Sequence, residues 1–525
     1  METADFPSLI VEQRPDEIVL MIGNLEMTEE VRKKIEFYGR EIDRLSIGEE
    51  YDELKHLIDD MKSFAQTDEE VKNDVSFNYY IGTGYGTYSN YVVRSGSKHT
   101  DQSVIDLRRQ SMFYLRKGIA LYDPTIYSDQ RAQLRILTNY ANGLDTVGRC
   151  LEALRIYRMV LGINDSFSIA LGNYGTALKF LANMVNDGGH YKELHCYAYQ
   201  AIKRALTIDD PDLHELAQAS FQCIVDKYES IPSRSILTED IVYTEYELGK
   251  TGEEKEYRTW CLKNHLFLNP LNEVMDVESA FAHDPLTITE LSETAHYSDS
   301  VSDYSTEPPR WFAMLNQLKE EYIYARYLCF EGLKKGDVHF ADRDVVLSIA
   351  DNSNIIYSIR IESLKSSFHI LYSMFDQICY FINDYWELGF EERRANAYNI
   401  CKAQNYPKDN YVLFSLYWVL CEFYEKYGNA ETAYEKDLAV LRNAIEHKYL
   451  KVHQSAWDRK LQSESDNFYH ITENDLKKCT MRLLEITREA LMYLVYAVGV
   501  DNKKKSKSEN AVSILLDNYL DEWKR

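Results

Sequence analysis

An internal repeat of 34 residues constrains the fold of this 525-residue chain more than any other feature of its sequence. Ala141 is followed three residues later by Leu144, and Gly175 and Leu178 repeat this relation 34 residues further on. A second apolar helical pattern follows each pair, although the later unit first inserts about eleven residues rich in Gly and His. Small residues at such positions let two helices pack closely, and a fixed period stacks the pairs into a superhelix.

This pattern resembles the tetratricopeptide (TPR) repeat, with two units that keep the period. Segments 78–88, 111–123 and 256–270 resemble eroded copies, and the apolar spacing between 27 and 66 predicts a further helix pair. We therefore expect an N-terminal helical extension over residues 1–75 and TPR-like helical repeats over 76–285. A plain antiparallel helical bundle is the alternative interpretation.

The periodicity stops between residues 286 and 309, where Ser, Thr, Asp, Glu and Pro accumulate, which predicts a linker. Helical patterns then resume, and four to five of them predict a compact bundle over 310–525. They cover residues 311–333, 358–388, 412–427, 430–450 and 475–498. The polar stretches 452–467 and 501–510 are predicted to be surface loops. The chain as a whole is predicted to be all-α.

The composition agrees with the all-α class and indicates in which cellular compartment the protein acts. Ten Pro and 22 Gly are too few for an all-β protein with many tight turns. The nine Cys are scattered without a CxxC pair, which is typical of reduced thiols rather than of a disulfide framework or a zinc site. The longest apolar runs are too short for a bilayer, and the acidic N-terminus is unlike a signal peptide. We expect a cytoplasmic protein without a membrane segment.

The net charge of −25 is divided unevenly along the chain. Residues 1–307 carry a net charge of −22, whereas the part from Pro308 to the end carries −3. A strongly acidic surface repels nucleic acid. The N-terminal half is therefore expected to bind a protein partner, and any polyanion is expected to bind the C-terminal part.

One residue pair with catalytic chemistry lies in the fourth helical pattern of the bundle. Arg442 and His447 are separated by four residues on a segment whose apolar positions recur at helical spacing: Leu438, Leu441, Ile445 and Tyr449. The same Arg-x4-His spacing occurs at Arg94 and His99, but within a Gly/Ser-rich loop that would not hold the pair rigidly. The helix fixes side-chain directions, which favours the second copy as a site.

The residue types in this segment suit RNA cleavage without a metal. Arg442 supplies a permanent, planar phosphate ligand, and His447 can act as general acid or base near neutral pH. Asn443, one turn before His447, can orient the imidazole or bind substrate. A base that removes the ribose 2′-OH proton lets that oxygen attack the adjacent phosphorus, while Arg stabilises the transition state. The alternative is an ordinary surface ion pair between Arg442 and Glu446 beside a solvated His.

The sequence RNAIEH at 442–447 resembles the signature of the HEPN superfamily (higher eukaryotes and prokaryotes nucleotide-binding). Segments 311–332, 366–389, 441–452 and 483–498 are similar to the HEPN family that carries TPR-like repeats in front. This resemblance implies a metal-independent endoribonuclease without a cofactor, acting as a homodimer with one composite cleft. Its products would carry a 2′,3′-cyclic phosphate, and such proteins commonly serve prokaryotic defence or toxin–antitoxin systems.

The resemblance assigns catalytic roles to Arg442, Asn443 and His447. Tyr449 completes the form Arg-x4-His-x-Tyr, in which a partner nucleotidyltransferase of HEPN toxins modifies the Tyr. Some members of the superfamily lack catalysis. The rival hypothesis is therefore a non-catalytic TPR adaptor with a HEPN domain that binds nucleotide or RNA and dimerises.

Basic residues after the motif predict an RNA-binding rim, although a solvated loop is the alternative. Residues 441–460 carry a net charge of +3, and the substrate-binding candidates are Lys448, Lys451, Arg459 and Lys460. His190 and His195 have no further metal ligand placed nearby, so we expect no metal there. The glycines at 82, 84 and 86 lack phosphate-loop spacing and are predicted to be packing positions of a repeat helix.

Overall fold

The computed structural model describes residues 27–123, 130–230, 243, 246–288, 290–294, 310–334, 338–348, 354–422, 436–454, 467–507 and 511–515. These residues are overwhelmingly helical, so the predicted all-α class is confirmed. The chain divides into two compact units. Of the described residues, the first unit takes those up to Phe180 and 195–230, and the second takes 181–194 and those from 243 onward.

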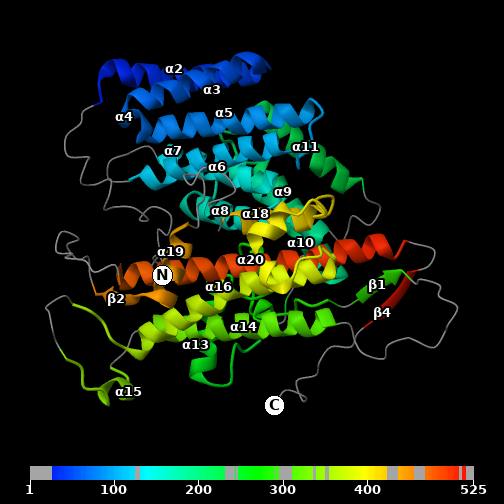
Figure 1. The fold of residues 1–525 in the computed structure, drawn as a ribbon. Coiled ribbons are helices and arrows are strands. Elements are labelled where there is room, and N and C mark those ends of the chain that lie inside the picture. Colours follow the sequence, from blue (N-terminus) through cyan, green and yellow to red (C-terminus); the bar gives the residue numbers. More distant parts are fainter. Residues whose placement is uncertain are drawn as a thin grey trace. The chain divides into compact units, whose positions relative to one another are not determined.

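The first unit is a succession of helices in which neighbours along the chain pack on one another (Figure 1). They are α2 Glu29–Ile47, α3 Tyr51–Thr67, α4 Glu69–Lys72, α5 Val75–Arg94, α6 Gln102–Leu121, α7 Gln130–Thr146, α8 Cys150–Ile163, the greater part of α9 Ser168–Met184 and of α10 Gly188–Ala205, and α11 Glu215–Glu229. The expected helix pair between 27 and 66 is α2 and α3. The segment with His190 and His195, expected to be an insertion, is the beginning of α10.

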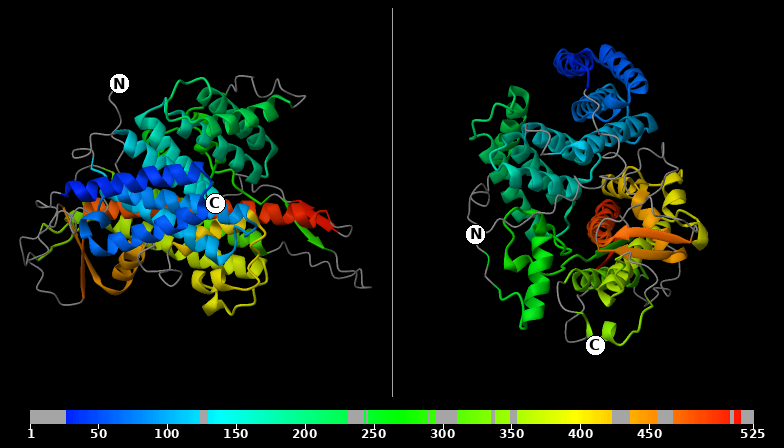
Figure 2. Two further views of the ribbon diagram at one scale, coloured as in Figure 1. Left: turned by 90° about the horizontal axis from the view of Figure 1, so that it is seen from above. Right: turned by 90° about the vertical axis from the view of Figure 1, so that its left-hand side faces the viewer.

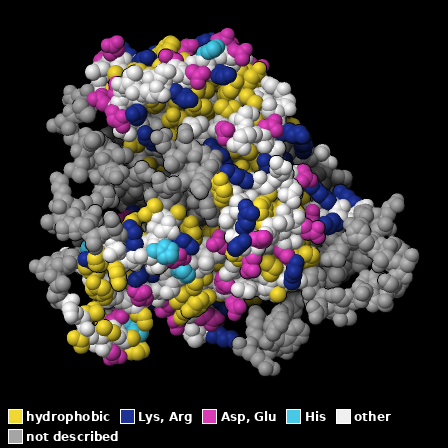
Figure 3. Space-filling model, viewed as in Figure 1, with side chains coloured by type: hydrophobic (Ala, Val, Ile, Leu, Met, Phe, Trp, Pro, Cys, Tyr) yellow, Lys and Arg dark blue, Asp and Glu magenta, His cyan; other side chains and the backbone are white. Residues whose placement is uncertain are grey.

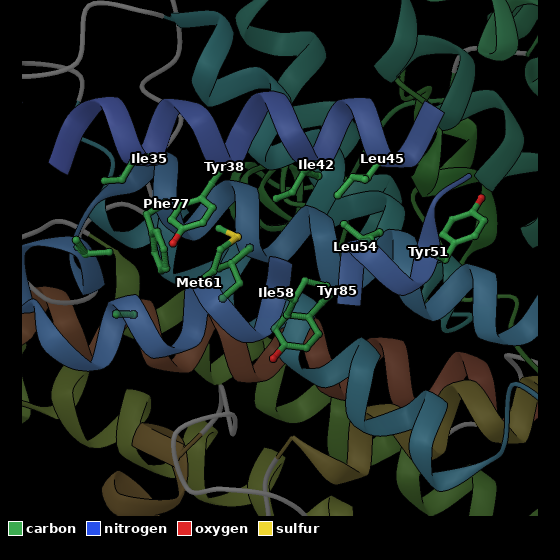
Figure 4. Close-up of a cluster of buried hydrophobic side chains, with 13 residues drawn as sticks. Ile35, Tyr38, Ile42, Leu45, Tyr51, Leu54, Ile58, Met61, Phe77 and Tyr85 are labelled. Atoms are coloured by element: carbon green, nitrogen blue, oxygen red, sulfur yellow. The ribbon is translucent and has the colours of Figure 1, made fainter. Parts of the chain in front are cut away.

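A cluster of buried apolar side chains joins α2, α3 and α5 (Figure 4). Ile35, Tyr38 and Ile42 recur at helical spacing on α2 and face Leu54, Ile58 and Met61 of α3 across this core. Each of these side chains is at most 3% exposed. The hydroxyl group of Tyr38 donates to Asp60 Oδ2 at 2.6 Å, which satisfies the polar end of the buried ring. The cluster explains why short amphipathic helices are stable at this end of the chain.

Two glycines let helices of the first unit approach each other closely. A Cβ atom at Gly82 of α5 would lie 2.8 Å from Leu115 Cγ of α6, and one at Gly175 of α9 would lie 2.8 Å from the Ala198 carbonyl oxygen of α10. The prediction that the Gly82 segment serves packing is therefore confirmed. Gly175 lies against Ala198 and Ile202 of α10, a close approach of two helices of the kind that the small residues of the 34-residue repeat predicted.

The carboxyl group of Asp145, near the end of α7, is expected to destabilise the first unit as the pH rises. Its Oδ1 atom is buried and has no hydrogen-bond partner among the described residues, and burial raises the pKa of the carboxyl from 3.8 to about 7. Between these two values the native state binds more protons than the unfolded chain, so the free energy of unfolding falls as the pH rises.

Asp145→Asn should therefore raise the free energy of unfolding of this unit by roughly 1–3 kcal/mol at pH 8 and by little at pH 4. Urea unfolding followed by far-ultraviolet circular dichroism measures the difference. The six Trp residues all lie at position 260 or later, so their fluorescence reports the second unit separately. Asp106→Asn on the exposed face of α6 is the matched control. An equal gain from Asp145→Asn at both pH values would contradict the assignment.

The second unit is a bundle built around a central helix, α20 (Glu473–Lys505). Residues 490–498 of this helix are apolar on all sides and buried, as expected of a helix that is surrounded by others. It packs against α14 (Arg310–Leu333), α16 (Ile359–Tyr385) and α18 (Tyr411–Cys421). The other helices described in this unit are α13 Gly252–Lys263, α15 Phe340–Arg343, α17 Ala397–Lys402, α19 Lys436–His447 and the 3₁₀ turns η1 Pro270–Glu273, η2 Ser279–Phe281 and η3 Glu392–Arg394.

Two buried arginines fasten residues 257–284 onto this bundle. Arg326 of α14 donates to both carboxylate oxygens of Asp284 at 2.8 and 2.9 Å, and also to the Leu266 carbonyl. Arg488 of α20 forms an ion pair with Glu273 and donates to the Phe267 carbonyl at 2.7 Å. Burial alone would raise the pKa of Asp284, but the adjacent Arg326 holds it below its ordinary value. This segment is thus part of the second unit.

Two short sheets complete the second unit. Strand β1 (Glu290–Thr294) pairs antiparallel with β4 (Ala511–Leu515), and β2 (Tyr449–His453) pairs parallel with β3 (Phe468–Thr472). Figure 2 shows the latter pair in orange beside the red helix α20. The prediction of a loop from 452 was therefore wrong where Val452 and His453 belong to a strand.

The loop predicted for 501–510 was also partly wrong, because residues 501–505 continue α20. Lys503, Lys504 and Lys505 occupy its last turn, where positive charge is favourable to the helix dipole. None of the helices in the described parts of the chain is long and apolar enough to cross a membrane. On the face shown in Figure 3, acidic and basic side chains are interspersed.

Candidate functional site

The predicted catalytic residues lie at the end of α19, which packs against α16. Leu438, Leu441 and Ala444 form the buried stripe of α19, each at most 3% exposed. The sequence predicted a stripe of Leu438, Leu441, Ile445 and Tyr449, but Ile445 is only half-buried and the stripe does not reach Tyr449. The helix instead ends at His447, and the chain turns into the extended strand β2, where the Tyr449 side chain is 70% exposed. The end of the helix thus leaves His447 and Tyr449 on the surface.

The guanidinium group of Arg442 is held between three neighbours. Its Nε atom lies 3.0 Å from Oε1 of Glu446, one turn later on the same helix. Its Nη1 atom donates to Oδ1 of Asn443 at 3.0 Å. The guanidinium carbon lies 5.7 Å from the centroid of the Tyr372 ring of α16, within cation–π range. The side chain is one-third exposed, so the group is oriented and still accessible.

Glu446 joins Arg442 to two histidines. Its carboxylate lies 3.5 Å from Nε2 of His447 and 3.6 Å from Nδ1 of His369, which comes from α16. The His447 side chain is 69% exposed and that of His369 is 48% exposed. One carboxylate therefore gathers an arginine and two solvent-accessible imidazoles from two helices. The ion pair that the alternative interpretation expected is present, and it belongs to this larger group.

Two further groups of α16 face the same site. Burial raises the pKa of the Tyr372 hydroxyl to about 12, although Arg442 opposes the shift. The pKa of the Asp376 carboxyl is raised, mainly because the group is buried. The positive charge of Arg442 opposes this shift, and the negative charge of Glu446 adds to it. Asp376 thus belongs to the electrostatic surroundings of Arg442. The site combines an arginine, two imidazoles and two carboxyl groups.

Sequence reasoning missed His369 and Tyr372, which are about seventy residues away from the motif. A signal for them was present, because His369, Tyr372 and Asp376 are spaced by three and four residues on a predicted helix. That spacing places side chains on one face of a helix. Glu446 was noticed only as the partner of Arg442. Its two contacts with histidine depend on the packing of α16 against α19, which no local pattern encodes.

The remaining candidates fall into three groups. Lys448 and Lys451 lie beside the site, Lys448 just after α19 and Lys451 on β2, whereas Arg459 and Lys460 lie outside the described residues. The pair at Arg94 and His99 is bound elsewhere: Arg94 donates to the Tyr51 hydroxyl at 3.3 Å, and the His99 ring contacts Arg108 at 2.8 Å.

His195 of α10, considered as a metal ligand, contacts the Tyr228 hydroxyl group at 2.7 Å instead. Within the described parts of the chain, no group of three or more His, Cys, Asp or Glu residues is arranged to hold a metal ion. The site at the end of α19 is therefore the strongest candidate on chemical grounds.

Comparison with known proteins points to the same part of the chain. Residues 302–501, which contain α14 to α19 and most of α20, match the family described as LA2681-like HEPN. No curated protein and no solved structure matches the chain.

Proposed function

Because residues 302–501 form a HEPN domain, we propose that the protein is a metal-independent endoribonuclease and that Arg442 and His447 carry the reaction. One observation supports this most strongly: both side chains are accessible at the end of α19 and both contact the carboxylate of Glu446. An arginine and a histidine held by one carboxylate are suited to a phosphate and its adjacent hydroxyl group. A purely structural ion pair between Arg442 and Glu446 does not require that the carboxylate also contact His447 and His369.

The chemistry follows from the residue types. A neutral imidazole removes the proton of the ribose 2′-OH, the O2′–P bond forms, and the P–O5′ bond breaks as an acid protonates the leaving O5′. Arg442 stabilises the negative charge that accumulates on the phosphoryl oxygens. The products are a 2′,3′-cyclic phosphate and a 5′-OH end. In this proposal His447 exchanges the proton with substrate, Asn443 positions Arg442, and the basic rim binds the RNA backbone.

Two proton-transfer groups are needed for this sequence of steps. A homodimer, as is common among HEPN domains, would supply His447 of a second copy. His369 offers a second imidazole within the same chain, because it shares the Glu446 carboxylate with His447. Glu446 is then a positioning residue that orients both rings. The acidic N-terminal unit would dock a protein partner and restrain the nuclease, in a prokaryotic defence or toxin system.

The proposal is tested by cleavage of a single-stranded RNA in excess EDTA, compared with a copy that carries 2′-O-methyl groups. We expect the unmodified RNA to be cut and the methylated copy to remain intact, since the methyl group removes the attacking nucleophile. Purified wild-type protein and gel analysis of end-labelled strands suffice for the measurement. Cleavage of both strands, or of neither unless divalent ions are added, would overturn the proposed mechanism.

A further inference from the structure

The parallel strands β2 and β3 present an aromatic face immediately after the candidate catalytic helix. Their register places Tyr449 opposite Phe468 and Lys451 opposite His470. Side chains alternate between the two faces of a strand, so these four residues share one face. β2 begins two residues after His447, which places Tyr449 within about 7 Å of it along the chain.

Tyr449 and Phe468 form an exposed pair. Their ring centroids are 5.6 Å apart, with an angle of 36° between the ring planes. Tyr449 is 70% exposed and Phe468 is 42% exposed. Lys451 Nζ lies 4.5 Å from the centroid of the Phe468 ring. Two adjacent rings open to solvent, with an ammonium group beside them, form a surface of a kind that binds flat, anionic ligands.

The two strands that carry the rings contain basic residues and no acidic ones. Residues 447–454 and 467–472 contain Lys448, Lys451 and the histidines at 447, 453 and 470, and neither stretch contains Asp or Glu. This stands out in a chain with a net charge of −25. Cationic side chains next to exposed aromatic rings are typical of surfaces that bind single-stranded nucleic acid, because the rings stack on bases and the cations contact phosphates.

We propose that Tyr449 and Phe468 form a stacking platform for a base of single-stranded RNA, with Lys448 and Lys451 on the adjoining phosphates. The position of the platform beside the scissile bond rests on the proposed function, whereas base binding does not. A platform of this kind accepts any base and rejects a duplex, whose bases are already stacked. It therefore assigns an unpaired substrate to the site.

The experiment measures binding without cleavage. A fluorescein-labelled 2′-O-methyl single strand of about twelve nucleotides is titrated with the full chain carrying His447→Ala, at fixed ionic strength, and fluorescence anisotropy is recorded. Adding Tyr449→Ala and Phe468→Ala should weaken binding about ten-fold or more. Tyr449→Phe should restore it in the presence of Phe468, because the ring remains. A duplex of the same sequence should bind more weakly and be insensitive to the two alanine substitutions.

The matched control is Tyr324→Ala with Phe340→Ala, two aromatic side chains that are 55% and 67% exposed on α14 and α15. It should leave the affinity unchanged. Equal affinity of the platform variant and its parent would overturn the proposal. Unchanged affinity with a lower mass in sedimentation would identify the surface as an interface between copies instead. If the wild-type protein cleaves no RNA but the two alanine substitutions still weaken binding, the nuclease is refuted and the platform stands.

Discussion

Replacing Arg442 and His447 together by alanine is expected to lower the rate of RNA cleavage at least about 1,000-fold. Loss of a positioned general acid or base typically costs about 10²–10⁴-fold, and loss of a charge that stabilises the transition state costs about 10²–10³-fold. The two effects act on one step, so they combine without being fully additive. The initial rate of cleavage of a single-stranded RNA in EDTA gives the measurement.

The chain contains a matched control for this variant. Arg94 and His99 have the same spacing, but each contacts a different residue, Tyr51 and Arg108, in the first unit. Arg94→Ala with His99→Ala should therefore cleave RNA at the wild-type rate. Both double variants should keep the Trp fluorescence of the native second unit. Wild-type activity in the Arg442/His447 variant would show that the reaction takes place elsewhere or comes from a contaminant.

Arg488→Met is expected to lower the free energy of unfolding of the second unit by about 3–5 kcal/mol. The guanidinium group is buried and holds Glu273, which is 1% exposed, together with the backbone of residues 267 and 269. Removal of the arginine deprives the buried Glu273 carboxylate of an adjacent positive charge, and this is costly. Urea unfolding monitored by Trp fluorescence reports the loss in this unit alone.

Two comparison variants separate this effect from that of an ordinary ion pair. Lys504 lies on the same helix as Arg488, and Lys504→Met removes its pair with Asp409. Those side chains are 50% and 77% exposed, so we expect a change of less than about 1 kcal/mol. Arg488→Met with Glu273→Leu removes both buried charges and should recover much of the stability. A loss from Arg488→Met no larger than that from Lys504→Met would contradict the role of the buried pair.

The helices could be predicted because they depend on local patterns. The 358–388 pattern is α16 (Ile359–Tyr385), and Ser358 caps it by accepting from the Ile361 N–H. The 311–333 pattern is α14 with one residue added. In each case the apolar period of a single helix carries the information.

The strands and the buried arginines could not be predicted in this way. Strand β2 has five residues, and its partner β3 begins fifteen residues after it ends, so nothing in YLKVH itself indicates the pairing. Arg326 and Arg488 read as ordinary charged positions on amphipathic helices. Their partners Asp284 and Glu273 lie 42 and 215 residues away along the chain. Such long-range contacts decide which polar residues are buried.

The residues of the candidate site likewise fall into those that local sequence predicts and those that only long-range packing brings together. Arg442, Asn443 and His447 were found because they are close in sequence and resemble a known motif. His369 and Tyr372 were missed because only the packing of α16 on α19 brings them there. Tyr449 was expected near the buried stripe, and it is exposed because α19 ends two residues earlier. Because it is exposed, the Tyr449 side chain is accessible to the predicted modification, and its ring forms one half of the platform.

The chemistry of the product ends tests the central claim most directly. Wild-type protein is incubated with a long single-stranded RNA in excess EDTA, and the fragments are analysed by mass spectrometry. The account predicts fragments that end in a 2′,3′-cyclic phosphate and begin with a 5′-OH group, because the 2′-oxygen is the nucleophile. Fragments with 5′-phosphate ends, which arise from attack by water, would contradict it.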